Sequence, residues 1–428
     1  MLPLIIPVTA LLMGAALLLM GTGLLNTLLA LRGVQEGFSD GSMGLIMSGY
    51  FVGFFIGTFL ALPLISRMGH IRAFAFCAAL VACSVLLHEL FINPWGWGLS
   101  RVLTGTALVI LYTIIESWLN AQTPPEQRGR IFAVYMVVNL AALALAQQFL
   151  QFGEISGFGF FAVASILVTL SLLPVTWTRV SQPEVQDVQR LPLKTLFNIA
   201  PVALYGALLS GLAMGAFWGM SALYAGRIGL DTQGVAMFMT CGILGGVLLQ
   251  YPLGRYSDTH DRRLVLAVVA CASVMAAALL AVLSSVGNWV MLAIAIYGGL
   301  AFAVYPLAVA HLVDHLEHKD ILAGGSALLL VHGLGAAVGP AVSGWLMAMT
   351  GPQALPAYFA ATLGTLAMVA VQYLHQEKTE SPESPAPFVP MVRTTPTVLE
   401  MLPEEDGENI STSANEDSVE EQYRESSG

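Results

Sequence analysis

Arg101, Glu116 and His332 are ionisable residues that lie inside long apolar stretches of the sequence. A charge buried in an apolar span costs roughly 2.5–3.5 kcal/mol on insertion scales, so such residues are candidates for function. An arginine can bind or sense negative charge. A carboxylate can carry a proton or form an ion pair, and an imidazole titrates near neutral pH. Each of the three can also have a structural role only.

Helix geometry places Glu116 and His332 at different depths. Glu116 follows Arg101 by 15 residues, about 22 Å along a helix, and this brings it within reach of Arg67 or Arg72. We interpret Glu116 as an ion-pair partner of one of these arginines, with a proton carrier as the alternative. His332 lies roughly 15 Å into its apolar run, near the middle of a ~30 Å hydrocarbon core. It is either a satisfied buried histidine or a protonatable site.

The elements that carry these residues have the composition of membrane spans. Of the 428 residues, 56% are hydrophobic and 10% are charged, against roughly a quarter charged in soluble domains. Mean hydropathy is +0.75. A spanning helix needs about 20 mostly apolar residues. Twelve such runs occur, at 5–31, 43–65, 73–92, 97–119, 131–152, 158–177, 198–225, 233–253, 264–284, 288–311, 322–349 and 353–374.

A polar segment divides these runs into two sets of six. We predict an N-terminal six-helix bundle at 1–177, a cytoplasmic linker at 178–197 and a C-terminal six-helix bundle at 198–375. An offset of 192 residues places Ser66 over Asp258 and Gly53 over Gly245. This indicates an internal repeat, which is typical of secondary transporters that expose a midplane site alternately to the two sides.

The predicted spans 131–152 and 322–349 correspond in this repeat, and aligning them places Asn139 at the position of His332. We therefore predict that these two side chains face each other across a central cavity. Further polar and aromatic residues at similar depth give it a neutral, aromatic lining. Together with Arg101, Asn139 and His332, the candidates for contact with a solute or coupling ion are Asn26, Tyr50, Tyr112, Tyr135, Gln148, Trp218 and Tyr297.

The basic residues predict the orientation. If the N-terminus is cytoplasmic, the cytoplasmic loops and the tail hold 14 of the 17 basic residues, and the opposite loops hold only Arg32 and Arg227. Both termini are therefore expected on the cytoplasmic side of a bacterial inner membrane. The net charge of −10 arises after Leu374, where 13 acidic residues face 3 basic ones. We interpret 376–428 as a disordered acidic cytoplasmic tail, either a solubilising extension or a regulatory segment.

The segment between the eighth and ninth predicted helices carries Gly254, Asp258, Arg262 and Arg263. A glycine lets two helices approach, a carboxylate can cap a helix N-terminus, and arginines can hold the loop in place. The pattern resembles the signature loop of the major facilitator superfamily, Gly-x-x-x-Asp-Arg-x-Gly-Arg-Arg. Here Asp261 stands at the position of the second glycine.

Other segments extend the resemblance over residues 1–375. The loop after the second predicted helix keeps Arg67 and Gly69, with Arg72 close behind, but has Ser66 at the aspartate position. Arg101, followed by a glycine four residues later, resembles a fourth-helix motif in which the arginine braces helix 1 or senses charge. Gly339 and Pro340 resemble a glycine-proline element of antiporters, but in another helix. Short stretches are most similar to the bacterial YcaD-like branch: 25–27, 50–51, 116–117, 128–130, 135–136 and 305–306.

The resemblance implies an all-α membrane protein with twelve transmembrane helices in two pseudo-symmetric six-helix bundles. It also implies a secondary active transporter that moves a small organic solute by alternating access. We expect coupling to protons or another ion, and a functional monomer. No phosphate-binding loop, metal-ligand spacing or basic nucleic-acid surface occurs, so we expect no cofactor, metal or nucleic-acid partner. The alternatives are a non-transporting receptor or scaffold and, less favoured, a membrane-embedded enzyme using the irregular cluster at 311–318.

The same pseudo-symmetry predicts a latch at the cytoplasmic face. Asp258 is expected against the start of the fifth helix, at 129–131, when the cytoplasmic side is closed. A carboxylate there would gain about 0.3–1 kcal/mol from the helix dipole. Ser66 is expected at the matching place beside 324–325, with a weaker, neutral contact.

Overall fold

The computed structural model describes residues 2–124, 127–177, 191–376, 388 and 391, and every regular element within these residues is a helix. Twelve spans are long and apolar enough to cross a membrane, which confirms the predicted fold class. The helices are α1 (Leu2–Gln35), α2 (Asp40–Met68), α3 (His70–Leu90), α4 (Pro94–Gln122), α5 (Arg128–Gln148), η2 (Phe149–Phe152), α6 (Gly159–Leu170), α7 (Leu172–Trp177), α8 (Leu193–Ile199), α9 (Pro201–Arg227), α10 (Thr232–Ser257), α11 (Arg262–Leu283), α12 (Trp289–Val313), η3 (His318–Asp320), α13 (Ile321–Thr350) and α14 (Ala354–Gln376).

Local chemistry sets the helix ends. Ser39, Asn93 and Asp231 are N-caps whose side-chain oxygens accept from the backbone N–H three residues on, which satisfies a free donor at each helix start. Gly69 separates α2 from α3 with φ +76°, a conformation that favours glycine. The fifth span continues into η2, and the sixth consists of α6 and α7.

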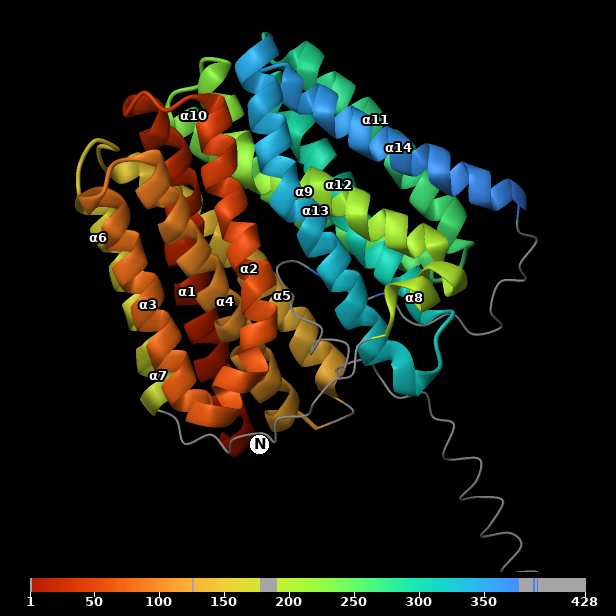
Figure 1. The fold of residues 1–428 in the computed structure, drawn as a ribbon, viewed down its shortest axis with the longest axis horizontal. Coiled ribbons are helices and arrows are strands. Elements are labelled where there is room, and N and C mark those ends of the chain that lie inside the picture. Colours follow the sequence, from red (N-terminus) through yellow and green to blue (C-terminus); the bar gives the residue numbers. More distant parts are fainter. Residues whose placement is uncertain (1, 125–126, 178–190, 377–387, 389–390, 392–428) are drawn as a thin grey trace, which may run out of the picture.

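The helices form two halves, α1–α7 and α9–α14, which lie beside each other (Figure 1). Part of the predicted linker forms the short helix α8, and 178–190 lie outside the described residues. Most of the predicted tail also lies outside them. Phe388 and Met391 are described, and both pack against the second half, so these two positions of the tail have a defined place.

Glycines bring helices within each half into backbone contact. A Cβ at Gly53 of α2 would overlap the Val102 carbonyl of α4, and one at Gly105 of α4 would overlap the Tyr50 carbonyl of α2. Gly245 meets the backbone of α12 in the same way. Gly49, Gly53 and Gly57 form a glycine stripe on α2 that faces α4. Gly53 and Gly245, which the repeat aligns, thus serve the same kind of close helix pair in the two halves.

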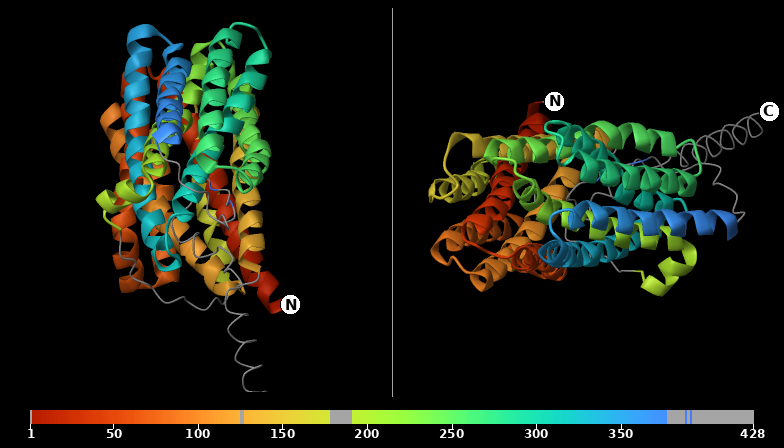
Figure 2. Two further views of the ribbon diagram at one scale, coloured as in Figure 1. Left: turned by 90° about the vertical axis from the view of Figure 1, so that its right-hand side faces the viewer. Right: turned by 90° about the horizontal axis from the view of Figure 1, so that it is seen from above.

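Polar contacts between the halves are found at the end opposite the N-terminus (Figures 1 and 2). Arg227 at the end of α9 binds Asp40 at the start of α2, with Nη2 2.6 Å from Oδ1. Beneath this ion pair, the Ala341 amide of α13 donates to Ser48 Oγ of α2 over 3.0 Å. Gly44 of α2 lies against the backbone of α13. Contacts of α2 with α13 and of α5 with α10 therefore close this end.

Candidate functional site

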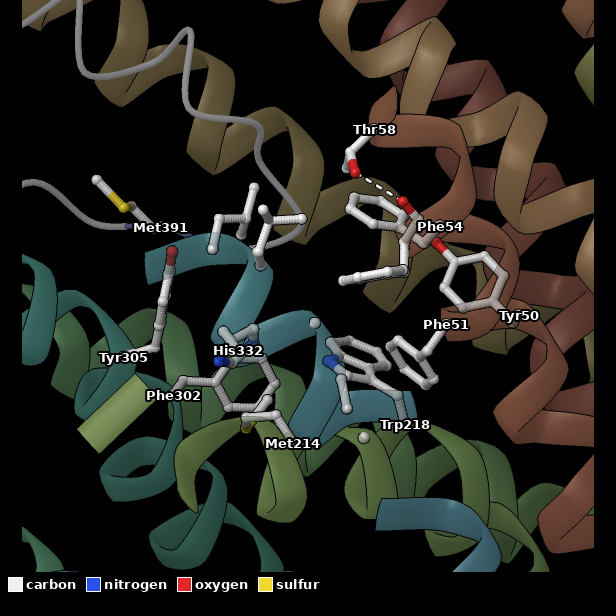
Figure 3. A pocket seen from close by; sticks show the side chains of 16 residues that line it. Tyr50, Phe51, Phe54, Thr58, Met214, Trp218, Phe302, Tyr305, His332 and Met391 are labelled. Carbon is white, nitrogen blue, oxygen red and sulfur yellow. Dashed lines mark hydrogen bonds between the residues drawn. The ribbon is translucent and has the colours of Figure 1, made fainter. Parts of the chain in front are cut away.

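A cavity lies between α2 of the first half and α9, α12 and α13 of the second (Figure 3). The space between its walls, including the part open to solvent, is about 860 Å³. Its walls extend from Tyr50 to Thr58 along α2 and reach Met391 on the other side. The cavity therefore continues from the closed contacts toward the end of the molecule that carries the Asp258 loop.

The first half contributes one face of α2. Tyr50, Phe51, Phe54, Phe55 and Thr58 line the cavity, and their spacing of one and four residues places them on adjacent rows of a helix. The glycine stripe of α2 lies on another face, against α4. Close packing of the glycine face therefore holds the aromatic face toward the second half.

His332 of α13 lines the opposite wall (Figure 3). Its ring lies 4.2 Å from the Tyr305 ring, centroid to centroid. Its Nδ1 lies 3.2 Å from Ser210 Oγ and 3.2 Å from the Ala207 carbonyl oxygen. Because a carbonyl only accepts, Nδ1 carries the proton in the neutral ring, and Nε2 is then the acceptor.

A buried polar cluster connects the two halves next to the cavity. Arg101 Nη2 donates to Asn26 Oδ1 over 2.8 Å, and Asn26 Nδ2 donates to the Trp218 carbonyl over 2.6 Å. The Arg101 guanidinium also lies 4.7 Å from the centroid of the Tyr50 ring, a cation–π distance. Arg101 thus braces α1, as the resemblance implies, and it supports two residues that line the cavity, Tyr50 and Trp218.

The other sequence candidates do not line the cavity. Tyr112, Tyr135 and Asn139 are buried inside the first half, so the predicted pairing of Asn139 with His332 across the cavity does not form. Tyr297 stacks on Phe359 with ring centroids 4.4 Å apart, within the second half. These rings fill space between neighbouring helices, and helix periodicity alone cannot distinguish that face from the cavity face.

Gln148 has a different position from the one predicted. Its Nε2 donates to Thr240 Oγ1 over 2.8 Å, which joins α5 to α10 across the two halves. Gln148 is therefore part of the contact between the halves and not of the cavity wall. The polar contacts of the closed end thus involve both helix pairs, α2 with α13 and α5 with α10.

The predicted ion pair of Glu116 with Arg67 or Arg72 is not formed. Glu116 is fully buried and accepts a hydrogen bond from Tyr135 Oη over 3.3 Å. Both arginines are exposed at the end of α2 and the start of α3. The turn at Gly69 directs them away from the helix interface in which Glu116 lies.

The signature loop forms a compact charge network at the end of α10. Arg262 Nε binds Asp314 Oδ2 of α12 over 2.6 Å, and Arg262 Nη2 binds Asp258 Oδ1 over 3.2 Å. Helix spacing alone would pair Asp314 with His311, but Asp314 binds Arg262. Arg263 Nη2 binds Asp261 Oδ2 over 3.1 Å.

Two carboxyl groups of this loop have shifted pKa values. Burial raises the pKa of Asp258 above its ordinary value, and the positive charge of Arg262 opposes this effect. For Asp261, burial also acts to raise the pKa, but hydrogen bonds from Arg263 outweigh it, and the pKa lies below its ordinary value. The network therefore favours the ionised form of Asp261 more than that of Asp258.

The predicted latch is not formed in this arrangement. Asp258 is bound by Arg262 and by the Phe388 amide. Exposed Ser66 donates to its own helix, at the Pro63 carbonyl, over 3.0 Å. Because the described polar contacts hold the halves together at the opposite end, contact of Asp258 with 129–131 and of Ser66 with 324–325 stays a prediction for a state that is closed at this end.

Gly339 and Pro340 have packing positions in the structure. A Cβ at Gly339 would overlap the Leu212 carbonyl of α9. Pro340 lies against Gly219 of α9, and its carbonyl lies against Gly44 of α2. The glycine-proline element therefore packs α13 against its own half and against the other half at the closed end.

Several lining residues were not among the sequence candidates: Phe51, Phe54, Phe55, Thr58, Met214, Phe302, Tyr305 and Met391. The α2 residues had a usable signal, because their aromatic rows run alongside a glycine stripe on the same predicted helix. Met391 had none, since it lies in a segment whose composition predicts disorder.

Sequence comparison identifies relatives over most of the chain. The profile of the Major Facilitator Superfamily matches residues 11–324 and 206–402. A protein of Shigella flexneri serotype 5b (strain 8401) named "Uncharacterized MFS-type transporter YcaD" is 29% identical over 343 residues, 80% of this chain and 89% of the relative. The YcaD protein of Escherichia coli (strain K12 / DH10B) is 28% identical over the same length.

Solved structures with the same fold include three transporters. The nucleoside transporter NupG superposes with a TM-score of 0.70 at 15% identity, covering 87% of this chain and 99% of NupG. A D-xylose–proton symporter gives a TM-score of 0.67 at 14% identity, covering 88% and 98%. A bacterial homologue of the lysosomal transporter Spinster, in an inward-facing and occupied conformation, gives 0.65 at 16% identity, covering 86% and 94%. The matching profile, the relatives and the twelve-helix fold agree, and the chain belongs to the Major Facilitator Superfamily.

Proposed function

We propose that this protein is a secondary active transporter that moves a small organic solute across the bacterial inner membrane by alternating access, coupled to protons. The observation that carries the proposal is the cavity between the two halves, which is closed at one end by Asp40, Arg227, Ser48 and Ala341 and continues to the other end. Alternating access requires such a site, reached from one side at a time.

The wall chemistry supports a solute with an extended apolar or aromatic surface. The side chains that face the cavity are mainly aromatic and aliphatic, and Trp218, Tyr305 and His332 bring polar atoms to them. An aromatic wall binds a planar or apolar surface without a requirement for a particular direction, whereas a few polar atoms fix orientation. We therefore propose an organic solute with an apolar body and one or two hydrogen-bonding groups.

His332 is the proposed site of proton coupling. It lies in the cavity wall, and its neutral form presents Nε2 as an acceptor. Histidine is the side chain whose unperturbed pKa lies nearest to neutral pH, about 6.5. A solute that binds beside the ring changes its surroundings, and a proton taken up from one side can then be released to the other.

The proposed orientation places the open end in the cytoplasm. This end carries the turn at Gly69 and the loop at Asp258, next to Arg67, Arg72, Arg262 and other basic residues that the positive-inside rule assigns to the cytoplasm. The structure would then correspond to an inward-facing state. Both termini would be cytoplasmic, and a monomer would be sufficient for transport because each chain contains both halves and the cavity.

The direct test is transport by purified protein in proteoliposomes. A panel of labelled organic solutes, graded from apolar aromatic compounds to sugars, is tested for uptake and efflux with and without an imposed pH gradient. We expect movement of the apolar aromatic group, accelerated by the gradient. A Gly333→Trp variant should abolish it, because Gly333 lines the cavity and an indole there would fill the space.

A matched control uses Gly98→Trp. Gly98 is also helical and, like Gly333, has open space where a Cβ would lie, but it belongs to α4 outside the cavity lining. Transport should survive this change. Full transport by the Gly333→Trp variant would contradict the assignment of the cavity. Absence of movement for every solute and gradient would favour a receptor, a scaffold or an enzyme over a transporter.

A further inference from the structure

Two residues beyond α14, Phe388 and Met391, lie against α10, and Met391 also lines the cavity. The Phe388 amide donates to Asp258 Oδ1 over 3.0 Å. The Phe388 ring covers Gly254 so closely that a Cβ at this glycine would overlap it. Gln250 Nε2 donates to the Met391 carbonyl over 3.3 Å. Met391 is 7% exposed and lines the same cavity as His332 (Figure 3).

The surface that receives them is one row of α10. Gln250, Gly254 and Asp258 are spaced by four residues, so they lie above one another along the helix. The row offers an amide donor, a gap without a side chain and a carboxylate acceptor. Phe388 binds at the outer end of the row and Met391 at the inner end, so the later residue of the chain lies nearer the cavity.

We propose that this row is a docking site for the chain's own C-terminal segment, and that docked Phe388 and Met391 act as a brake on the transport cycle. The inference rests on the proposed function. Met391 forms part of the wall of the cavity in which a solute would bind. Phe388 covers the glycine gap and binds the carboxylate that the opposite half is predicted to contact when this end closes.

Charge does not decide the location. Arg255, Arg262 and Arg263 near the docking row are balanced by Asp258, Asp261 and Asp314, and Arg262 and Arg263 are already paired with these carboxylates. The proposal therefore rests on the Phe388 and Met391 contacts with the row.

The test measures opening of the closed end and needs no solute. In a variant without Cys77, Cys83, Cys241 and Cys271, a single Ser48→Cys substitution places a thiol between the halves at the closed end. A membrane-impermeant maleimide reaches it from that side only when the halves part there. In the full chain, Phe388→Ala combined with Met391→Ala should raise the labelling rate about tenfold, equivalent to about 1.4 kcal/mol of lost contact free energy.

Two controls keep this result specific. Gln353→Cys, in the exposed loop before α14 at the same end, should label equally fast with and without the tail substitutions. Val398→Ala combined with Leu399→Ala removes comparable apolar surface from the same tail and should leave Ser48→Cys labelling unchanged. Both double variants keep the charge of the tail, so a difference between them reports the two contact positions.

A cross-link supplies an independent measurement. A disulfide between Gln250→Cys and Met391→Cys should form on oxidation, slow the labelling of Ser48→Cys and be reversed by reductant. Unchanged labelling in the Phe388→Ala, Met391→Ala variant, or a cross-link without effect, would overturn the brake. Increased labelling in a chain that moves no solute would instead contradict the proposed function and leave the docking site intact.

Discussion

The ion pair between Asp40 and Arg227 gives the most direct test of the closed end. Both Nε and Nη2 of Arg227 donate to Asp40 Oδ1, over 2.9 and 2.6 Å. The pair joins α9 to α2, so it exists only while the halves meet at this end. Asp40→Asn removes the charge and keeps the shape, and it should therefore favour the state that is open here.

The expected magnitude follows from the exposure of the two side chains. The Arg227 side chain is 36% exposed and that of Asp40 is 11% exposed, so water screens the pair in part. Exposed pairs contribute about 0.2–1 kcal/mol, and the two charge-assisted hydrogen bonds place this one toward the upper limit. About 1 kcal/mol corresponds to a shift of roughly fivefold in the equilibrium between the two states. Labelling of Ser48→Cys should increase by that factor.

The matched control is the pair of Arg32 and Glu36 at the same end. Arg32 Nε lies 2.6 Å from Glu36 Oε1, but both residues belong to the first half. Glu36→Gln should therefore leave labelling unchanged. Arg227→Gln should reproduce the effect of Asp40→Asn, which excludes a cause in the dipole of α2 alone. Equal labelling of the Asp40→Asn and Glu36→Gln variants would refute the reasoning.

Three further predictions concern the helix packing, the buried carboxylate and the cavity. Gly53→Ala should lower the free energy of unfolding by about 1–3 kcal/mol, because its Cβ would overlap the backbone of α4. Gly98→Ala should leave the free energy of unfolding unchanged, because there is open space where its Cβ would lie. Thermal unfolding in detergent measures both. Glu116→Gln should reduce stability or shift the conformational equilibrium without changing the pH dependence of transport. Loss of proton coupling in a normally folded variant would instead assign Glu116 as a proton carrier. His332→Gln should flatten the pH profile of transport between pH 5.5 and 8, whereas His375→Gln, exposed at the end of α14, should retain it.

Hydrophobic runs were sufficient to predict the spans. The predicted run at 43–65 became α2 (Asp40–Met68), and the run at 288–311 became α12 (Trp289–Val313). A segment that crosses lipid must form its backbone hydrogen bonds internally, so an apolar run of this length is expected to fold as a helix. The ends of α2 extend further because the cap at Ser39 and the turn at Gly69, which set them, depend on local chemistry and not on hydropathy.

The cavity was only partly predictable, because depth along a helix is easier to infer than direction around it. Of the predicted candidates, His332, Trp218 and Tyr50 line the cavity. Tyr297 and Asn139 are buried within their own halves instead. Both kinds of surface are apolar with occasional polar atoms, so the sequence pattern around the helix does not separate them. Which side of a helix faces the cavity depends on which neighbouring helix packs against its glycine face.

The distribution of close contacts indicates which parts move together. Within each half, glycines hold α2 against α4, α10 against α12 and α9 against α13 through backbone contacts. A contact of this kind allows no sliding without steric overlap, so each half should move as a unit. The polar contacts between the halves described above lie instead toward one end and involve side chains such as Asp40 and Arg227. Separation at that end requires the loss of these polar contacts and of the close packing of Gly44 against α13, whereas the helix pairs within each half stay intact. The predicted contact of Asp258 with the start of α5 would compete with Phe388 for the same carboxylate, so we expect closure at the other end to displace Phe388 from Asp258.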